Sequence, residues 1–172
     1  LKAGLGWGNI TTALRWNHIL QPKLFANSTL TYSRYRFETS NGFESLEKEM
    51  GKIVSEDKYH VSYFSGIDDV AGKIDFDFLP DPDHYIRFGG NAILHTFKPG
   101  TFRSGYSSYD VDGDTSSFSS DYIQSNVHAT EFAMYAEDDW KVSDRLRVNG
   151  GLHFSGFVQK GKPYFSLQPR AN

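Results

Sequence analysis

The sequence predicts an all-β fold: an antiparallel up-and-down meander, six strands plus the start of a seventh, forming part of a large transmembrane β-barrel. Three observations support this prediction. Apolar and polar residues alternate with a period of two, short turns alternate with long polar loops, and no apolar run is long enough for a spanning helix. Alternate connections of a meander lie at the same end of the sheet, and this asymmetry is typical of outer-membrane barrels.

The predicted connections fall into two classes. Short turns are expected at Gln21–Lys23, Pro80–Asp83 and Val142–Asp144, and the prolines among them lack a ladder donor and fix φ. Long loops are expected near 40–58 (Ser40–Lys58) and 98–126 (Lys98–Asn126), with a smaller one at Gln159–Tyr164. Within the first loop, apolar residues recur near helical spacing and predict a short surface helix in Glu44–Asp57.

The predicted strands are taken in chain order. The first hairpin joins Asn9–Leu20 to Leu24–Thr39, where the alternation is weaker. Tyr59–Leu79 and His84–Phe97 form the second hairpin, and Thr130–Lys141 and Arg145–Val158 form the third, with the clearest alternation. Phe165–Arg170 opens the seventh strand. Asp138 interrupts an otherwise apolar row, and the sequence offers no reason for it.

Composition excludes several classes of function. The net charge of −3 gives no nucleic-acid footprint, and the absence of Cys rules out disulfides and thiolate metal sites. The mean hydropathy of −0.51 is compatible with a barrel, whose alternating strands average to polar. No nucleophile elbow, dinucleotide fingerprint, phosphate loop or paired-histidine zinc motif is present, so the sequence does not predict an enzyme.

Several motifs resemble the barrel wall of TonB-dependent outer-membrane receptors. Tyr135-x-Glu137-Asp138-x-Trp140-Lys141 is similar to their mid-barrel strand, and Leu146–Gly151 and Leu167–Arg170 resemble the strands that follow it. His153 stands where an arginine is usual. Further segments resemble receptors of the Bacteroidetes lineage: Trp7–Thr12, Asn17–His18, Gln21–Phe25, Gly72–Phe76 and His95–Gly100.

This resemblance implies a barrel of roughly 22 strands with a plugged lumen, located in the bacterial outer membrane and importing a siderophore, cobalamin or a glycan. It also implies contact with outer-membrane lipid and with the TonB complex, and a surface lipoprotein partner is a further expectation. We expect residues 1–172 to be a partial barrel domain of a longer chain, without the plug and the TonB box.

The loop predicted at 98–126 contains two candidate sites. Its aromatic residues can stack on a sugar or catecholate face, and they are Phe102, Tyr106, Tyr109, Phe118 and Tyr122. Its acidic residues follow the spacing of an EF-hand calcium loop, although Thr115 replaces the usual glycine and no flanking helices are expected. They are Asp110, Asp112, Asp114 and Asp121. The alternatives are a self-packed aromatic loop and a solvated acidic loop. No other cofactor is expected.

Two other interpretations of the whole chain stay open at the level of sequence. A soluble β-sandwich or a lipocalin-like barrel would present the same aromatic loops to a glycan, with its apolar rows closed into one core. A purely structural envelope protein would bind no ligand. One-sided burial fits each of them, and only the loop asymmetry and the strand lengths favour a membrane barrel.

The expected size and location of the native gene product provide a test. An antibody against 98–126 should detect, in separated membranes, an outer-membrane band several times larger than the 19.5 kDa of this chain. A soluble band near 19.5 kDa would instead identify a small secreted β-domain.

Overall fold

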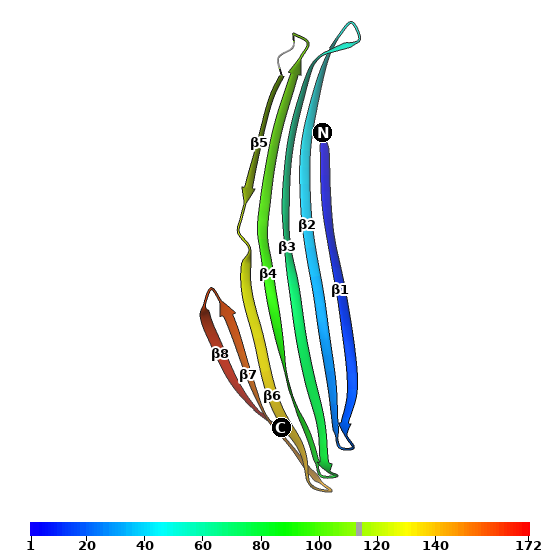
Figure 1. Ribbon diagram of the computed structural model, residues 1–172, viewed down its shortest axis with the longest axis vertical. Coiled ribbons are helices and arrows are strands. Elements are labelled where there is room, and N and C mark those ends of the chain that lie inside the picture. Colours follow the sequence, from blue (N-terminus) through cyan, green and yellow to red (C-terminus); the bar gives the residue numbers. More distant parts are fainter. Residues whose placement is uncertain (113–114) are drawn as a thin grey trace. The chain divides into compact units, whose positions relative to one another are not determined.

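The structure is a computed structural model that describes residues 1–112 and 115–172, and its strands form an antiparallel sheet. Neighbouring strands follow the order β1-β2-β3-β4-β6-β7-β8, and β5 pairs with β4 (Figure 1). The strands are β1 Lys2–Gln21, β2 Leu24–Glu49, β3 Lys52–Asp81, β4 His84–Asp110, β5 Thr115–Ile123, β6 Val127–Ser143, β7 Leu146–Gln159 and β8 Lys162–Ala171. Among the described residues, no helix is long and apolar enough to cross a bilayer.

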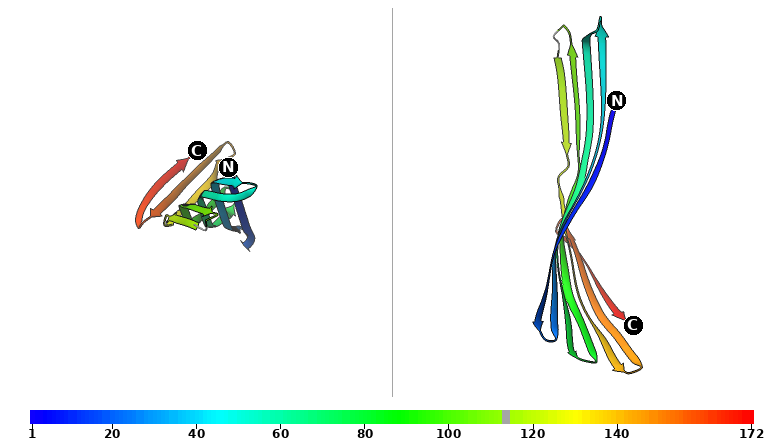
Figure 2. Two further views of the ribbon diagram at one scale, coloured as in Figure 1. Left: turned by 90° about the horizontal axis from the view of Figure 1, so that it is seen from above. Right: turned by 90° about the vertical axis from the view of Figure 1, so that its right-hand side faces the viewer.

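The predicted meander is confirmed, with one additional strand. β5 pairs with β4 from Thr101↔Ile123 to Tyr109↔Thr115, and β6 is a second neighbour of β4. Residues 124–126 separate β5 from β6 and belong to neither strand. The predicted seventh strand is present over ten residues as β8, which lies beside β7 (Figure 2).

The three predicted short turns are present, and the third lies slightly later than predicted because Val142 and Ser143 belong to β6. Two-residue turns at 22–23, 82–83 and 144–145 join β1 to β2, β3 to β4 and β6 to β7. The last of them is held by Lys141 Nζ, 2.7 Å from Asp144 Oδ1. The smaller loop predicted at 159–164 is also a two-residue turn, at Lys160 and Gly161. Their φ values of 49° and 75° fit a type I′ hairpin turn, which requires positive φ at both central residues.

The ranges predicted as long loops are strands for most of their length. β2 and β3 continue through 40–58 to a turn at Met50 and Gly51, where φ is 50° and 81°. The predicted helix in Glu44–Asp57 is therefore wrong, because a hairpin turn lies in its middle. Residues 98–126 hold the end of β4 and all of β5. Period-two alternation extends through both ranges, and polar composition concealed it.

The chain divides into two compact units, and strands β1–β4 contribute residues to both. Unit 1 contains residues 1–10, 34–67 and 97–127, and unit 2 contains residues 11–33, 68–96 and 128–172. Each unit is described by itself below.

Unit 2 has an apolar face built from one row of alternating side chains per strand. In β6–β8 the register brings Phe132, Phe154 and Phe165 together, with ring centroids 5.7–6.3 Å apart. Phe76 stacks on Phe88 across β3 and β4 at 4.9 Å. The row continues through the remaining strands of the unit with Leu14, Trp16, Leu30, Ile74, Met134, Leu152 and Leu167.

The unexplained Asp138 has a partner on this same face. His84 Nδ1 lies 2.7 Å from Asp138 Oδ2, and the His84 ring stacks on Trp140 at 5.5 Å. His84 is the first residue after the turn at 82–83, so this polar pair stands at the turn end of the apolar row. The sequence could not show it because 54 residues separate the two partners.

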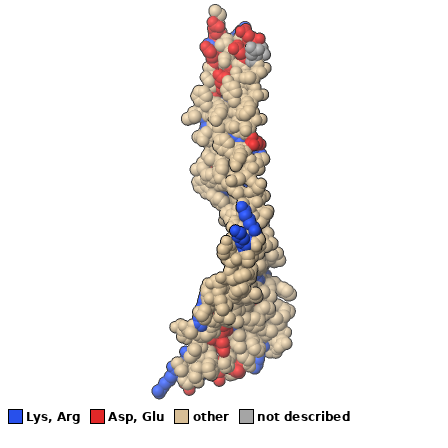
Figure 3. Space-filling model, turned by 90° about the vertical axis from the view of Figure 1, so that its left-hand side faces the viewer, with Lys and Arg blue, Asp and Glu red and all other residues tan. Residues whose placement is uncertain are grey.

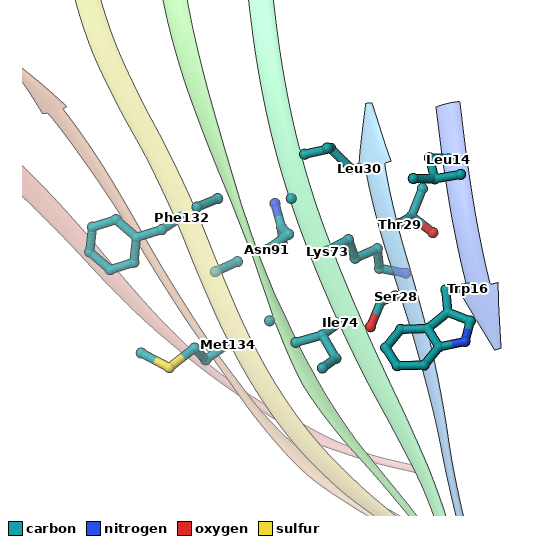
Figure 4. Close-up of a pocket in the computed structure, with 14 residues that line it drawn as sticks. Leu14, Trp16, Ser28, Thr29, Leu30, Lys73, Ile74, Asn91, Phe132 and Met134 are labelled. Atoms are coloured by element: carbon teal, nitrogen blue, oxygen red, sulfur yellow. The ribbon is translucent and has the colours of Figure 1, made fainter. Parts of the chain in front are cut away.

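An open groove of about 650 Å³ crosses the apolar face of unit 2 (Figure 4). Leu14, Trp16, Ile74, Phe132 and Met134 line it, and its floor is lowered by small residues on three strands. Those residues are Ser28, Gly72, Gly90 and Ala92.

Neither unit encloses a hydrophobic core among the described residues. In the part of the chain that the structure describes, the buried apolar side chains are Ala26 and Ala129, at 7% and 4% exposure. Large apolar residues are exposed instead, including Trp16 at 64% and Met134 at 56%. A sandwich or a lipocalin-like barrel would bury such rows against each other, so the apolar face of unit 2 lacks the partner that these folds provide.

The packing around Gly156 on the apolar face leads to a prediction about stability. A Cβ on Gly156 would collide with the Phe132 ring, which lies across β7 at this position. Gly156→Val should displace that ring and lower the free energy of unfolding by about 1–3 kcal/mol, as overpacking does. The measurement is urea unfolding of the protein in detergent. Gly72→Val is the matched control, because a Cβ there meets no atom within 4 Å, and equal effects of both variants would contradict the prediction.

Candidate functional site

In unit 1, aromatic side chains gather on one face of the β4–β5 hairpin. Phe102 pairs with Tyr122 and Tyr106 pairs with Phe118, so the four rings stand in two directly opposed pairs on one side. They are 44%, 67%, 41% and 65% exposed, in that order, and so are available to a ligand. Tyr109, the fifth predicted residue, alternates to the other side, where it pairs with Thr115.

Three more strands extend this aromatic face within unit 1. The Tyr106 hydroxyl donates to Asp57 Oδ1 at 2.8 Å, which places the odd-numbered residues of β3 on the same side. Phe37 meets Tyr63 edge to face at 6.4 Å, which adds the odd-numbered residues of β2. On β1, Lys2 contacts Glu44 of β2 on the even-numbered side, so the odd-numbered residues of β1 lie with those of β2. The aromatic residues that join the face in this way are Trp7, Tyr35, Phe37, Phe43, Tyr59 and Tyr63.

The two faces of unit 1 differ in charge. Among the described residues of β1–β5 in this unit, Lys98 is the one Lys or Arg whose numbering matches the aromatic row of its strand, and it lines a pocket with Arg36 and Phe64 of the opposite face. Between its rings the aromatic face carries Ser, Thr, Asn, Asp and Glu. The opposite face, here named the mixed-charge face, carries residues of both signs. On the side of the molecule drawn in Figure 3, acidic and basic side chains form separate small groups.

Ion pairs on the mixed-charge face join β1 to β2 and β4 to β5, and another lies within β3. The Lys2 ammonium donates to Glu44 Oε2 at 3.4 Å and holds the pKa of the Glu44 carboxyl below its ordinary value. The Glu56 carboxylate, 2.6 Å from Lys58 Nζ, raises the pKa of Lys58. Arg103 Nε lies 3.3 Å from Asp121 Oδ2, and its guanidinium stands over the Phe64 ring at 5.8 Å.

The base of the β4–β5 hairpin is fixed by Tyr63. Its hydroxyl donates to the carbonyl of Pro99 at 2.8 Å, and a Cβ on Gly100 would approach its ring to 2.6 Å. Gly100 has a positive φ of 152°, and its carbonyl accepts from the Gln124 backbone N–H at 3.2 Å. Glycine at this position therefore lets the Tyr63 ring pack against the backbone where β5 ends.

The predicted calcium ligands are spread along the hairpin. Asp121 stands opposite Arg103, whereas Asp110 is the last residue of β4. Seven positions of strand separate Arg103 from Asp110, roughly 23 Å at the usual rise, so Asp121 and Asp110 are not brought together. The Asp112 backbone N–H donates to Asp110 Oδ1 at 3.3 Å. Asp114 lies outside the described residues, so calcium binding stays a prediction. Among the described residues, no three acidic or histidine side chains group around one point.

Unit 2 has a polar face opposite its apolar one. Tyr135 reaches from β6 across Gly89 of β4, and its hydroxyl donates to Asp75 Oδ1 on β3 at 2.8 Å. Lys73 Nζ approaches the same carboxylate at 2.7 Å. A side chain at Gly89 would meet the Ile74 carbonyl and Asp75, so the glycine leaves the space that Tyr135 spans.

Charged pairs continue across this polar face. Arg87 Nη2 lies 2.6 Å from Glu137 Oε1, and its guanidinium stands 5.4 Å above the Tyr85 ring. The Tyr85 hydroxyl donates to Asp77 at 2.5 Å, and Asn27 donates to the same carboxylate at 3.3 Å. These contacts link β2, β3, β4 and β6.

A second set of pairs involves His95. Its Nδ1 lies 2.8 Å from Asp69 Oδ1, and its Nε2 lies 3.8 Å from Glu131 Oε2. The polar face is thus a network of paired side chains of both signs.

Comparison with known protein families identifies the family of this chain. A family model of the TonB-dependent receptor-like β-barrel matches residues 3–172. The chain belongs to the TonB-dependent receptor family. No curated protein matches the chain.

Membership of this family indicates which surroundings each of the two faces of unit 2 contacts. Barrels of this kind are outer-membrane receptors and transporters that interact with TonB, and not enzymes. In such a barrel, strands present apolar side chains to lipid and polar ones to the interior. The groove and the phenylalanine cluster of the TonB-dependent receptor chain therefore belong to its lipid-facing wall, and the network around Tyr135 belongs to its interior. The soluble-module interpretation loses its support.

Sequence reasoning found part of the aromatic face and missed the rest. The receptor brings Phe102, Tyr106, Phe118 and Tyr122 together, and it separates Tyr109 from them. The members on β1–β3 were missed because part of their range was taken for a loop. A signal was present, since Tyr35, Phe37, Phe43, Tyr59 and Tyr63 all occupy odd-numbered positions.

The interior network predicts the effect of removing one hydroxyl. Tyr135→Phe leaves the Asp75 carboxylate without its hydroxyl donor and should lower the free energy of unfolding by about 1 kcal/mol. Urea titration in detergent measures it. Tyr32→Phe, an exposed tyrosine of the apolar face, should change stability by less, and a larger loss there would contradict the assignment of the two faces.

Proposed function

We propose that this receptor imports a neutral glycan and that the aromatic face of unit 1 captures it. Unit 1 holds the hairpins at 50–51 and 110–115, in the ranges predicted as long connections, and long connections of outer-membrane barrels face the outside of the cell. The observation that carries the proposal is the composition of the face, with paired exposed rings and hydrogen-bonding side chains, and with no Lys or Arg among the described residues of this face that lie between the paired rings.

The chemistry of the face favours a sugar over the other cargoes of the family. Aromatic rings offer flat apolar area to the C–H face of a pyranose, and Ser, Asn and carboxylate side chains bond hydroxyl groups. An anionic ferric siderophore would require Lys or Arg among the rings, because charge-assisted pairs dominate the recognition of anions. The aromatic face instead carries Asp57 beside Tyr106, and the Asp57 carboxylate would repel an anionic ligand.

Capture would be followed by passage through the barrel interior along the polar face. We propose energy coupling to the TonB complex through a plug domain of the same receptor, and a surface lipoprotein that covers the aromatic face. This arrangement corresponds to the Bacteroidetes-type receptors that the sequence motifs resemble. Calcium at Asp110, Asp112 and Asp114 would order the tip of the hairpin and is a secondary proposal.

The decisive experiment removes one ring from each of the two opposed pairs. The purified receptor is titrated with a panel of neutral oligosaccharides, and Phe102→Ala/Phe118→Ala is compared with Tyr109→Ala, the matched control on the other side of the same hairpin. The double variant should weaken binding by about tenfold or more per ring, and the control should bind as the native receptor does.

Uptake by cells that carry each variant should follow the same order. Binding of a ferric siderophore in place of every glycan would assign the face to iron acquisition and contradict the glycan proposal. Equal losses in the double variant and in Tyr109→Ala would show that the aromatic face is not the binding surface.

A further inference from the structure

The groove on the apolar face of unit 2 has the size and the walls of a binding site. Its volume of about 650 Å³ lies within the range of small-ligand pockets, roughly 300–1,000 Å³. Leu14 and Trp16 of β1 form one wall, and Phe132 and Met134 of β6 form the other (Figure 4). Between the walls the floor is low, so a slender molecule would be contacted from both sides.

Gaps in the apolar rows of β3 and β4 explain why the groove is hollow. In β3, Gly72 stands two positions before Ile74 in the same row, and in β4 the row continues with Gly90 and Ala92. These positions carry little or no side chain, so the floor there is the backbone. A Cβ on Gly72 would meet no atom within 4 Å, which shows that the space above it is open.

The groove offers no free charge to a ligand. Among the described residues that line it, Lys73 is the one charged residue. Its side chain alternates to the polar face, where its Nζ lies 2.7 Å from Asp75 Oδ2. Thr29 and Asn91 alternate to the polar face as well, which leaves Ser28 as the polar side chain in the rows that face the groove. A ligand would therefore be recognised by shape and apolar contact.

The surroundings of the groove determine which molecule can fill it. The apolar face of unit 2 is the lipid-facing wall of the receptor, so the groove opens to the bilayer. In hydrocarbon, apolar surfaces gain nothing from leaving water, and close packing is what stabilises a contact. An unfilled groove would lose dispersion contacts along its lining. An acyl chain is the molecule of matching width and polarity that the bilayer supplies at this surface.

One end of the groove carries an amphipathic pair of rings. On β1, Trp16 is nearer than Leu14 to the turn at 22–23, and it is 64% exposed. Its ring lies 5.2 Å from that of His18, the next residue of the same row. Both rings combine an apolar body with polar nitrogen atoms, and Trp is enriched where the membrane meets water. This pair therefore marks the end at which a lipid headgroup would leave the groove.

We propose that the groove holds one acyl chain of a phospholipid, with the headgroup beside Trp16 and His18. The chain lies on the floor over Gly72 and stays with the receptor, whereas lipid against the rest of the wall exchanges with the bilayer. The proposal depends on the family of the chain and on unit 2 alone. It is independent of the aromatic face and of which nutrient is imported.

The test uses the full-length receptor in detergent micelles that contain palmitoyl-oleoyl phosphatidylethanolamine brominated in its oleoyl chain, because bromine quenches the fluorescence of a tryptophan that it contacts. The contribution of Trp16 is the difference between the native receptor and Trp16→Phe. A chain held in the groove should quench Trp16 at low lipid content and then saturate. Quenching that rises in proportion to lipid content without saturating would overturn the proposal, and this measurement needs no groove variant to fold.

A groove variant and a matched control follow the same readout. Gly72→Phe fills the groove from its floor and should abolish the saturable quenching of Trp16. Gly150→Phe places the same ring in the apolar row of β7, outside the lining of the groove, and a Cβ there also meets no atom within 4 Å. This control should be quenched as the native receptor is, and equal loss in both variants would contradict a site in the groove.

Two further comparisons identify what is recognised. Phosphatidylglycerol with the same brominated chain should saturate at the same lipid content, because the groove offers no free charge, and a preference of about tenfold or more for one headgroup would overturn recognition through the acyl chain. A protein that co-purifies with the receptor, and must be removed before the lipid quenches Trp16, would assign the groove to a protein partner and overturn the proposal.

Discussion

Strand register is the constraint on which every surface of this receptor chain depends. Side chains alternate with a period of two, so a slip by one residue in β6 would send Phe132 and Met134 to the interior and Tyr135 and Glu137 to the lipid. Hairpin turns with positive φ at 50–51 and 160–161 fix the pairing at strand ends. Glycines fix it in the middle, because Gly156 leaves room for the Phe132 ring and Gly89 leaves room for the Ile74 carbonyl and Asp75 of β3.

The sheet is stabilised without a protein core of its own. Two alanines are the only buried apolar residues among those described, and the large apolar side chains of unit 2 are exposed. In water, each exposed Å² of apolar surface costs about 25 cal/mol, so the bilayer supplies the environment that a second sheet supplies in a sandwich. On the polar face, side chains stabilise the sheet by pairing with one another. Such contacts join Asp77, Tyr85, Arg87 and Glu137.

The sequence predicted those features that depend on local alternation and on turn chemistry. The meander, its short turns and the apolar row of β6 and β7 follow from residues near one another in the chain. The interruption at Asp138 could not be understood in that way, because its partner His84 is distant. The prediction of loops at 40–58 and 98–126 was wrong for another reason, because Ser-rich and charged stretches have a loop-like average composition. The strand pattern is nevertheless visible, since Tyr35, Phe37 and Phe43 all occupy odd-numbered positions.

Part of the candidate site was accessible from sequence and part was not. Four of the five predicted aromatic residues share one face, since all four are even-numbered in paired strands. Tyr109 is also aromatic, but it is odd-numbered, so its side chain lies on the other side of the hairpin. The absence of Lys48, Lys52 and Lys58 from the aromatic face became visible only when strands replaced loops, because alternation then assigned them to the other side.

The break at 124–126 has a consequence for how such receptors can diversify. Among the described strands, β5 pairs with β4, from Thr101↔Ile123 to Tyr109↔Thr115, while the other side of β4 pairs with β3. β5 leads into β6 through three residues outside any ladder. Insertions, deletions or replacement of the whole hairpin would be absorbed at this joint without shifting β6. The hairpin is therefore an exchangeable cassette, through which recombination between related genes can change what the receptor recognises while its wall is inherited unaltered.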